Sequence, residues 1–385
     1  MDTERERVVE GVGRERHGAL GLPWHPRLAE RMLDPERPGR LAALVETGLL
    51  AAGRGRDEQG EKDQGEPAHP RIPSGGDTQR VHVVALFGPT GVGKTAVAIA
   101  LAERLRRRGE RPLAISADAL QVYRGLETLT GAASAEERGR LEHRLLAFVP
   151  VTETFSVGEF AARAHAEIDA ALATGRRPVV VGGTGLYLQA ALTDLDLRPP
   201  PEAAVRARIE AEVTDRGPEA LHEELAARAP AAAAAIQPGD RTRVIRALEL
   251  LEMGEEPAPA GDESRLWTAE LRHPTLLCGL VMERAALYAR IDARVDEMVA
   301  AGAADEARRA QAAGASLTAR KALGFDELLR GDRDAMTRRT RNYAKRQLTW
   351  MRRLEQVREF DLTRASPDAV AADIESALLR EEGDR

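Results

Sequence analysis

From about residue 81 onward, short apolar runs alternate with amphipathic segments along the chain. Val81–Phe87, Pro112–Ser116 and Pro178–Gly183 are rich in apolar residues and are typical of buried strands. Lys94–Arg108 and Phe155–Ala173 place apolar residues at helical spacing. Strands that alternate with helices predict an α/β fold, in which helices flank both faces of a parallel sheet.

After Pro201 the pattern becomes helical. The alanine-rich stretch Glu202–Ala235 predicts a small all-helical insertion at 201–236, and further helical regions are predicted at Arg284–Gln311 and Thr337–Val357. The expected organisation is a first part of the core at 81–200, the insertion, a core completion with basic C-terminal helices at 237–360, and a C-terminal helix or tail at 361–385.

Residues 1–80 differ in composition from the rest. Leu20–Leu50 could form one or two short helices, whereas Gly53–Arg80 is rich in Gly, Asp, Glu, Gln and Pro. Such a segment has too few large apolar residues to build a core. We therefore expect a partly disordered N-terminal extension, to which the sequence assigns no chemistry.

Bulk composition limits the classes of function. A chain of 385 residues with 43% hydrophobic and 31% charged residues is typical of a globular protein with ample core. Apolar runs are shorter than a membrane span and no signal-peptide pattern opens the chain, so we expect a cytoplasmic protein without a membrane partner. The single cysteine, Cys278, excludes an intramolecular disulfide, and its apolar surroundings predict a buried, inert thiol. The net charge of −6 argues against general coating of nucleic acids but allows a local basic surface.

The strongest chemical motif lies between the first strand and the first helix. It has the spacing G-x-x-x-x-G-K-T, which forms a phosphate-binding loop in this context. Backbone N–H groups would converge on phosphate oxygens, Lys94 would contact the outer phosphates and the Thr95 hydroxyl would ligate Mg²⁺. Taken alone, the loop indicates binding of a nucleotide such as ATP. Its residues are Gly88, Pro89, Thr90, Gly91, Val92, Gly93, Lys94 and Thr95.

Two further motifs follow predicted strands. Asp118 could hold magnesium or act as a base, and it could equally cap a helix N-terminus. The glycine-rich turn 182–185 is favoured as a tight strand-to-helix connection. Because ligands of parallel sheets bind at the carboxyl ends of the strands, we expect both motifs and the phosphate loop to lie at one edge.

The segment Thr337–Leu354 contains seven basic residues and no acidic one. Arg338, Arg341, Lys345 and Arg352 recur at helical spacing. Such a stripe is either a solvated helix face or a track for nucleic-acid phosphates, and the lack of acidic partners favours the second interpretation. Arg243 and Arg246 share a helical face upstream, where they could clamp phosphates or be ordinary surface arginines.

Taken together, these motifs resemble those of the tRNA dimethylallyltransferases, also called tRNA isopentenyltransferases, over residues 81–357. Beside the phosphate loop, the resemblance rests on A-D-x-x-Q-V-Y-R-G at 117–125, H-x-L at 143–145, F-S-V-x-E-F at 155–160, G-G-T-G-L-Y at 182–187, R-A-L-E at 246–249, L-Y-x-R-I-x-x-R-V-D at 287–296 and Y-A-K-R-Q-x-T-W at 343–350.

The resemblance implies transfer of a dimethylallyl group from its diphosphate to N6 of an adenosine beside the tRNA anticodon, at position 37. It implies a P-loop NTPase-like fold, Mg²⁺, and a monomer whose helical insertion grips the anticodon stem. Asp118 would accept the N6 proton, Thr90 would lie near the transfer site and Arg246 would contact the diphosphate. The implied tRNA-binding residues are Asp118, Ala119, Leu120, Gln121, Thr184, Arg206, Thr242, Arg243, Arg246, Lys345, Arg346, Gln347, Trp350 and Arg352.

The chain departs from the family pattern at a few positions. Ala119-Leu120 stands where a Ser-Met pair is usual, the T-A-K-P loop is Thr130-Gly131-Ala132-Ala133, and paired histidines become His143-Arg144. Ala119 lacks a hydroxyl that could bond to the target base. The alternatives are a prenyltransferase of free adenine nucleotides, a P-loop kinase or NTPase, and a catalytically weakened tRNA-binding relative.

Overall fold

The computed structural model describes residues 82–195, 197–198, 200–257, 270–354 and 356–383. Its centre is a six-stranded sheet in the order β4-β2-β6-β1-β7-β8, and every adjacent pair is parallel. The predicted α/β class is therefore confirmed. The strands are β1 (Val83–Phe87), β2 (Pro112–Ala117), β4 (His143–Arg144), β6 (Arg177–Gly182), β7 (Thr275–Val281) and β8 (Arg358–Asp361), with β3 (Tyr123–Arg124) and β5 (Val149–Pro150) forming a separate two-stranded sheet.

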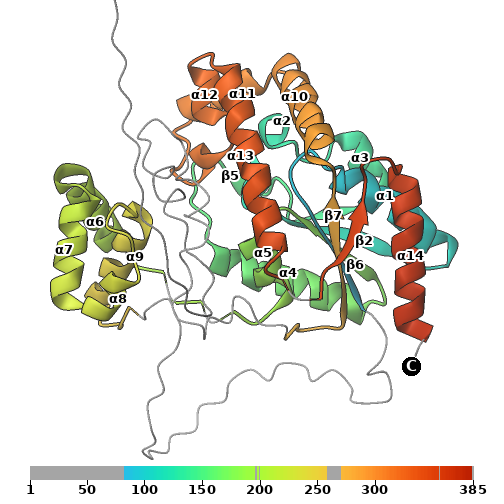
Figure 1. Ribbon diagram of the computed structural model, residues 1–385, viewed down its shortest axis with the longest axis horizontal. Coiled ribbons are helices and arrows are strands. Elements are labelled where there is room, and N and C mark those ends of the chain that lie inside the picture. The colour runs from blue at the N-terminus through green and yellow to red at the C-terminus, as the bar shows by residue number, and fades with distance from the viewer. Residues whose placement is uncertain (1–81, 196, 199, 258–269, 355, 384–385) are drawn as a thin grey trace, which may run out of the picture. The chain divides into compact units, whose positions relative to one another are not determined.

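Helices cover both faces of the large sheet (Figure 1). Helices α1 and α14 pack together on one face, and α4 and α5 pack together on the other. Helix α13 contacts α5, α10 and α12. The helices of the core are α1 (Lys94–Arg107), α2 (Glu127–Thr130), α3 (Ala135–Arg140), α4 (Val157–Ala173), α5 (Gly185–Leu192), α10 (Arg284–Ala300), α11 (Ala303–Ala312), α12 (Phe325–Leu329), α13 (Arg333–Met351) and α14 (Pro367–Gly383), with a 3₁₀ turn at Ala319–Lys321.

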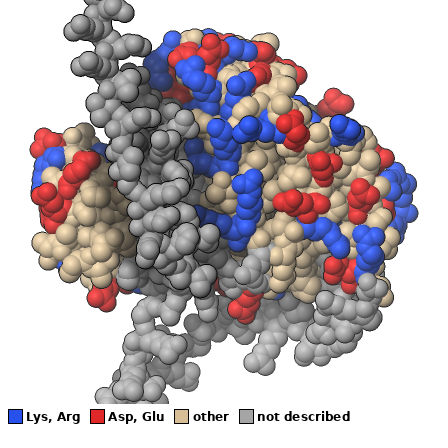
Figure 2. Space-filling model, in the orientation of Figure 1, with Lys and Arg blue, Asp and Glu red and all other residues tan. Residues whose placement is uncertain are grey.

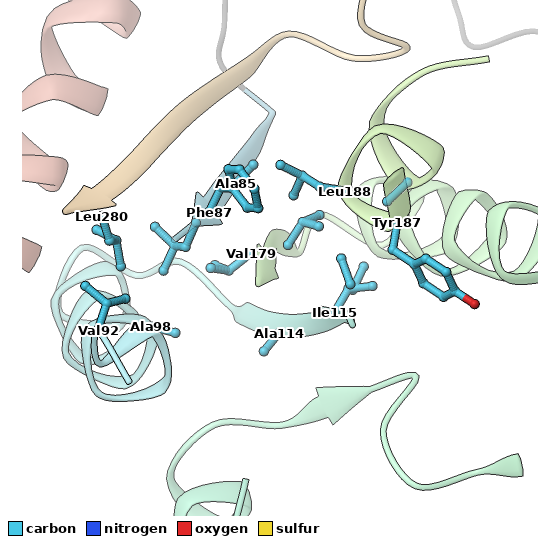
Figure 3. Packing of buried hydrophobic residues seen from close by; sticks show 14 of the residues in the cluster. Ala85, Phe87, Val92, Ala98, Ala114, Ile115, Val179, Tyr187, Leu188 and Leu280 are labelled. Atoms are coloured by element: carbon cyan, nitrogen blue, oxygen red, sulfur yellow. The ribbon is translucent and has the colours of Figure 1, made fainter. Parts of the chain in front are cut away.

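The core forms around the central strand β1, whose five residues are all buried. Figure 3 shows Phe87 of β1 among side chains from neighbouring elements, including Val179 of β6 and Leu280 of β7. Continuous apolar strands suit this position because a parallel sheet with helices on both faces is buried on both sides. Cys278 lies in this core, where burial raises the pKa of its thiol, as expected for an inert cysteine.

Element ends follow local capping chemistry. Ser156 caps α4 in a capping box with Glu159, which explains why the helix begins at Val157. The predicted helix over Arg284–Gln311 is two helices, because Gly302 adopts a left-handed φ of 91° between them. Asp332 caps α13, so this helix begins at Arg333, before the predicted start, and ends at Met351.

The helical insertion has an apolar cluster of its own. Its helices are α6 (Ala203–Arg216), α7 (Pro218–Arg228), α8 (Pro230–Ala234) and α9 (Arg241–Glu252). Helix α9 was predicted to belong to the core completion after 236. Its residues Val244 and Leu248 instead pack in the same cluster as Leu221 and Leu225 of α7, so the helical unit continues through α9. The N-terminal extension at 1–80 lies outside the described residues.

Candidate active site

The phosphate loop joins β1 to α1 with the backbone shape that the motif predicts. Gly91 and Gly93 have φ values of 83° and 103°, a region that disfavours side chains, and Gly93 directly precedes α1. A Cβ at Gly88 would lie 2.8 Å from the carbonyl oxygen of Leu280 on β7. The glycines therefore allow a tight turn at the N-terminus of a helix, where the N–H groups and helix dipole favour an anion.

Lys94 folds back over its own loop. Its Nζ donates hydrogen bonds to the carbonyl oxygens of Gly88 at 2.9 Å and Pro89 at 3.0 Å. Burial lowers the pKa of Lys94 to about 8, the carboxylate of Asp118 opposes this effect, and the guanidinium of Arg294 adds to it. The ammonium thus lies in a site where a bound anion would restore its ordinary pKa.

Asp118 follows β2 at the same edge of the sheet. Its Oδ1 accepts a hydrogen bond from the N–H of Leu120 at 3.0 Å, and the residues after it form a turn that leads to β3. The helix N-cap interpretation of Asp118 is therefore wrong. Nearby, Gln121 Nε2 donates to the carbonyl oxygen of Gly131 at 3.2 Å, which ties this turn to the end of α2.

The glycine-rich turn after β6 is both a strand-to-helix connection and part of the site. A Cβ at Gly182 would lie 2.3 Å from the carbonyl oxygen of Ala117, so the turn packs closely against the end of β2. The buried Thr184 Oγ1 lies 3.0 Å from the Tyr343 hydroxyl and accepts the N–H of Ala119 at 3.5 Å. The loops after β1, β2 and β6 are thus connected at one edge of the sheet.

Side chains of helix α13 at positions 343, 347 and 350 contact these loops. Gln347, which is 4% exposed, accepts the N–H of Thr90 at 2.7 Å and donates to the carbonyl oxygen of Gly183 at 2.7 Å. Trp350 is buried against Gly185, where a Cβ would lie 2.0 Å from its ring. Gln347 and Trp350 were predicted to contact tRNA. Both side chains are buried, Gln347 joins two loops and Trp350 packs against Gly185. Their contact with tRNA stays a prediction.

Tyr343 is a further site residue, and the sequence presented it only as part of the motif at 343–350. Its hydroxyl contacts Thr184, and burial raises its pKa, so it stays a neutral hydrogen-bonding group. The signal that could have identified it is the spacing of positions 343, 347 and 350, which marks one face of a helix.

The basic residues of α13 have different surroundings. Arg339 is buried and pairs with the buried Glu327 of α12 at 2.7 Å, and Arg341 pairs with Asp292 of α10. The segment was expected to lack acidic partners. This expectation is wrong for Arg339 and Arg341, because α12 and α10 supply their carboxylates. The exposed basic stripe consists of Arg338, Lys345 and Arg352, and Figure 2 shows Lys and Arg side chains gathered on the face that carries α13.

The arginines of the insertion that were predicted to contact diphosphate or tRNA also have different surroundings. Arg206 makes two hydrogen bonds to the buried Glu249, at 2.7 and 3.0 Å, and Arg246 is buried beside the same carboxylate at 3.2 Å. Arg243 is exposed and pairs with the N-cap Asp240. Arg243 and Arg246 thus lie in different surroundings, one exposed and one buried, and do not form a pair on one exposed surface. Contact of Arg206, Thr242, Arg243 or Arg246 with diphosphate or tRNA stays a prediction.

Two arginines of α10 were not singled out from the sequence: Arg290 lies at the phosphate loop, and Arg294 lies at the end of α2. Nη2 of Arg290 lies 3.2 Å from the position that a Cβ of Gly93 would take. Arg294 donates from Nη2 to the carbonyl oxygen of Gly131 at 2.9 Å. Their signal is the four-residue spacing within the motif at 287–296, which places both arginines on one helix face.

Within the described ranges, no three His, Cys, Asp or Glu side chains are grouped to hold a metal ion. Mg²⁺ commonly binds through one or two protein oxygens together with substrate phosphates, and the hydroxyl of Thr95 in the first turn of α1 fits that kind of site. None of the helices in the described part of the chain is long and apolar enough to span a bilayer.

Comparison with known proteins identifies the family. The model of the "IPP transferase" family matches residues 121–354. A tRNA dimethylallyltransferase of Kineococcus radiotolerans is 42% identical over 71% of this chain and 88% of its own length, and one of Anaeromyxobacter dehalogenans is 44% identical over 71% and 90%.

Solved structures agree. A tRNA isopentenylpyrophosphate transferase of Bacillus halodurans has 35% sequence identity and a TM-score of 0.57, covering 80% of this chain and 97% of its own. A eukaryotic dimethylallyltransferase described as acting on tRNA has 25% identity and a TM-score of 0.62, covering 77% of each chain. Because the family model matches more than half of the chain and the relatives cover more than two thirds of it, the chain belongs to the IPP transferase family, with the tRNA dimethylallyltransferases.

Proposed function

We propose that the chain transfers a dimethylallyl group from dimethylallyl diphosphate to N6 of the adenosine at position 37 of tRNA, beside the anticodon, and releases diphosphate. The observation that carries the proposal is the set of hydrogen bonds through which Gln347 and Tyr343 of α13 join the phosphate loop to the turn after β6. A site that binds only a small phosphate ligand does not need a basic helix built into its wall.

The phosphate loop would hold the diphosphate of the donor. The N–H groups at the start of α1 and the ammonium of Lys94 would stabilise the negative charge that grows on the departing oxygens. Thr95 would hold Mg²⁺ together with the phosphates, and the ion, when bound, supplies additional charge neutralisation. The leaving group is thus the part of the donor that this loop would bind, whereas the carbon chain is transferred.

Asp118 is the group that we assign to accept the proton. The lone pair of the adenine N6 forms a bond to C1 of the dimethylallyl group, the C1–O bond breaks, and its electron pair leaves with the diphosphate. The proton lost from N6 passes to the carboxylate. Since the N–H of Leu120 holds Oδ1, Oδ2 is the oxygen that would accept it. Thr90, whose N–H is held by Gln347, would lie beside the transferred group.

The anticodon stem-loop of tRNA is the proposed partner of the exposed side of α13. Arg338, Lys345 and Arg352 would contact backbone phosphates, and the target base would leave its stack to enter the site. We propose that the protein acts as a monomer. The reaction would occur in the cytoplasm, where the tRNA substrates are found.

One assay tests the function against its alternatives. The protein is incubated with dimethylallyl diphosphate, Mg²⁺ and unmodified tRNA, and the digested nucleosides are analysed by mass spectrometry. A prenyl mass gain on adenosine of tRNA is expected. Gain on AMP but not on tRNA would instead identify a nucleotide prenyltransferase, and no gain on either would leave a tRNA-binding protein or an NTPase.

A further inference from the structure

Glu306 of α11 is a buried carboxylate whose two oxygens bind the backbone of another helix. Its side chain belongs to a residue that is 8% exposed. Oε1 accepts the N–H of Thr128 at 3.0 Å, and Oε2 accepts the N–H of Leu129 at 2.8 Å. Both N–H groups lie in the first turn of α2, so the carboxylate joins two segments that are far apart in the chain.

Helix α2 depends on this contact because it is a single turn of four residues. The first N–H groups of a helix have no partner within it, and one isolated turn is not stable in water. Leu126, at the N-cap position, makes no side-chain hydrogen bond that would satisfy these groups. A carboxylate suits the position, since its charge is favourable at a helix N-terminus and each oxygen can accept one N–H. Glu306 therefore fixes α2 on α11.

The other end of α2 holds the turn that follows β2. Gln121 Nε2 donates to the carbonyl oxygen of Gly131 at 3.2 Å, and Gln121 Oε1 accepts the hydroxyl of Ser116 at 3.4 Å. The side chain of Gln121 thus bridges the end of α2 and the end of β2. Asp118 lies in the same turn, with Oδ1 held by a backbone N–H. A continuous set of contacts therefore runs from Glu306 through α2 to the turn that carries Asp118.

The phosphate loop has different supports. Gln347 of α13 accepts the N–H of Thr90, and Lys94 donates to carbonyl oxygens of the loop itself. A displacement of α2 would consequently act first on the turn after β2, where the acceptor base is proposed to lie. The donor side of the site should be affected much less.

We infer that Glu306 is a positioning residue, which acts through α2 and Gln121 to hold the turn at 118–121 in place for the acceptor adenosine. The adenosine rests on the proposed function, whereas the effect on the turn does not depend on it. Glu306→Gln is the most informative change. Glutamine has the same length, but its amide offers one oxygen and an NH₂ group that cannot accept an N–H, so one of the two hydrogen bonds is lost.

The first test measures hydrogen exchange of the full chain by mass spectrometry. Glu306→Gln should speed exchange several-fold in the peptides that cover α2 and residues 118–123, while the peptide of the phosphate loop exchanges as in the wild type. Asp305→Asn is the matched control, because it removes the same charge from the neighbouring exposed position, where Asp305 pairs with Arg308. Faster exchange in α2 alone, or equally throughout the chain, would overturn the inference.

The second test compares catalysis with donor binding. In Glu306→Gln, kcat for transfer to tRNA should fall by about tenfold to a hundredfold, whereas binding of inorganic pyrophosphate with Mg²⁺ should stay within about threefold of the wild type. Adding Glu306→Gln to Gln121→Ala should lower kcat by less than about twofold further, since both changes interrupt the same set of contacts. Losses that multiply in the double variant would contradict action through Gln121.

The two tests also separate this inference from the proposed function. If the wild type transfers no prenyl group, the proposed function fails, and exchange at 118–123 alone decides whether Glu306 positions the turn. Should Glu306→Gln not fold, Glu306→Asp takes its place, because it keeps the charge on a side chain that is one methylene shorter. Wild-type exchange at 118–123 in that variant, together with wild-type kcat, would overturn the inference.

Discussion

The phosphate loop and helix α13 meet at Gln347, yet they are built differently. The loop is eight consecutive residues whose shape depends on its own glycines and on the strand and helix that it joins. Helix α13 has one face buried against the loops, one arginine buried on Glu327, one paired with Asp292, and exposed basic residues at Arg338, Lys345 and, directly after its end, Arg352. A loop of this kind can be recognised from a string of letters, whereas the role of each residue in α13 depends on which element it faces.

The largest effect on the transfer rate is expected from Asp118, because the proposed proton transfer depends on a single carboxylate oxygen. Asp118→Ala should lower the transfer rate by about 10²- to 10⁴-fold, because it removes the proposed proton acceptor. Affinity for tRNA, measured by filter binding, should stay within about threefold of the wild type. Transfer at an undiminished rate would show that another group accepts the proton.

Gln347 tests whether α13 positions the phosphate loop. Gln347→Leu removes two buried hydrogen bonds and leaves the N–H of Thr90 and the carbonyl of Gly183 without these partners. We expect kcat to fall by about tenfold or more and the free energy of unfolding to fall by about 1–3 kcal/mol. Thr349→Val, on the exposed side of the same helix, is the control. If Gln347→Leu weakens only tRNA binding, Gln347 contacts the RNA and does not position the phosphate loop.

The exposed and the paired basic residues of α13 should differ in the salt dependence of tRNA binding. Replacing Arg338, Lys345 and Arg352 together by Gln should lower the slope of log affinity against log salt by about 2 to 3. Arg341→Gln should change it by less than a third as much, because Asp292 already neutralises Arg341. Equal changes per residue would remove the distinction between the two groups.

The smallest effect is expected from a change of pH on pyrophosphate binding. Since burial lowers the pKa of Lys94 to about 8, its ammonium is present below pH 8 and is lost as the pH rises through 8. Binding of pyrophosphate should therefore weaken several-fold between pH 7 and pH 9. The Lys94→Ala variant controls for ionisation of the pyrophosphate itself, and the same pH profile in this variant would contradict the assignment to Lys94.

Much of the fold could be predicted because its signals are local. The apolar runs at β1, β2 and β6, the helices between them and the glycine spacing of the loop each depend on neighbouring residues. The two-residue strands β3, β4 and β5 lacked such signals, since they are too short for a periodic pattern. The end of the helical unit was also missed, because α9 joins it through the apolar contacts of Val244 and Leu248.

The sequence by itself determined the α/β class, the phosphate loop and the acidic residue that follows β2, because each is encoded within a few consecutive residues. The tertiary structure alone decided that Gln347 and Trp350 are buried, that Asp292 and Glu327 neutralise two arginines of α13, and that Arg290 reaches the phosphate loop. The reason is that burial and charge compensation depend on residues far apart in the chain, and only the folded structure brings these residues together.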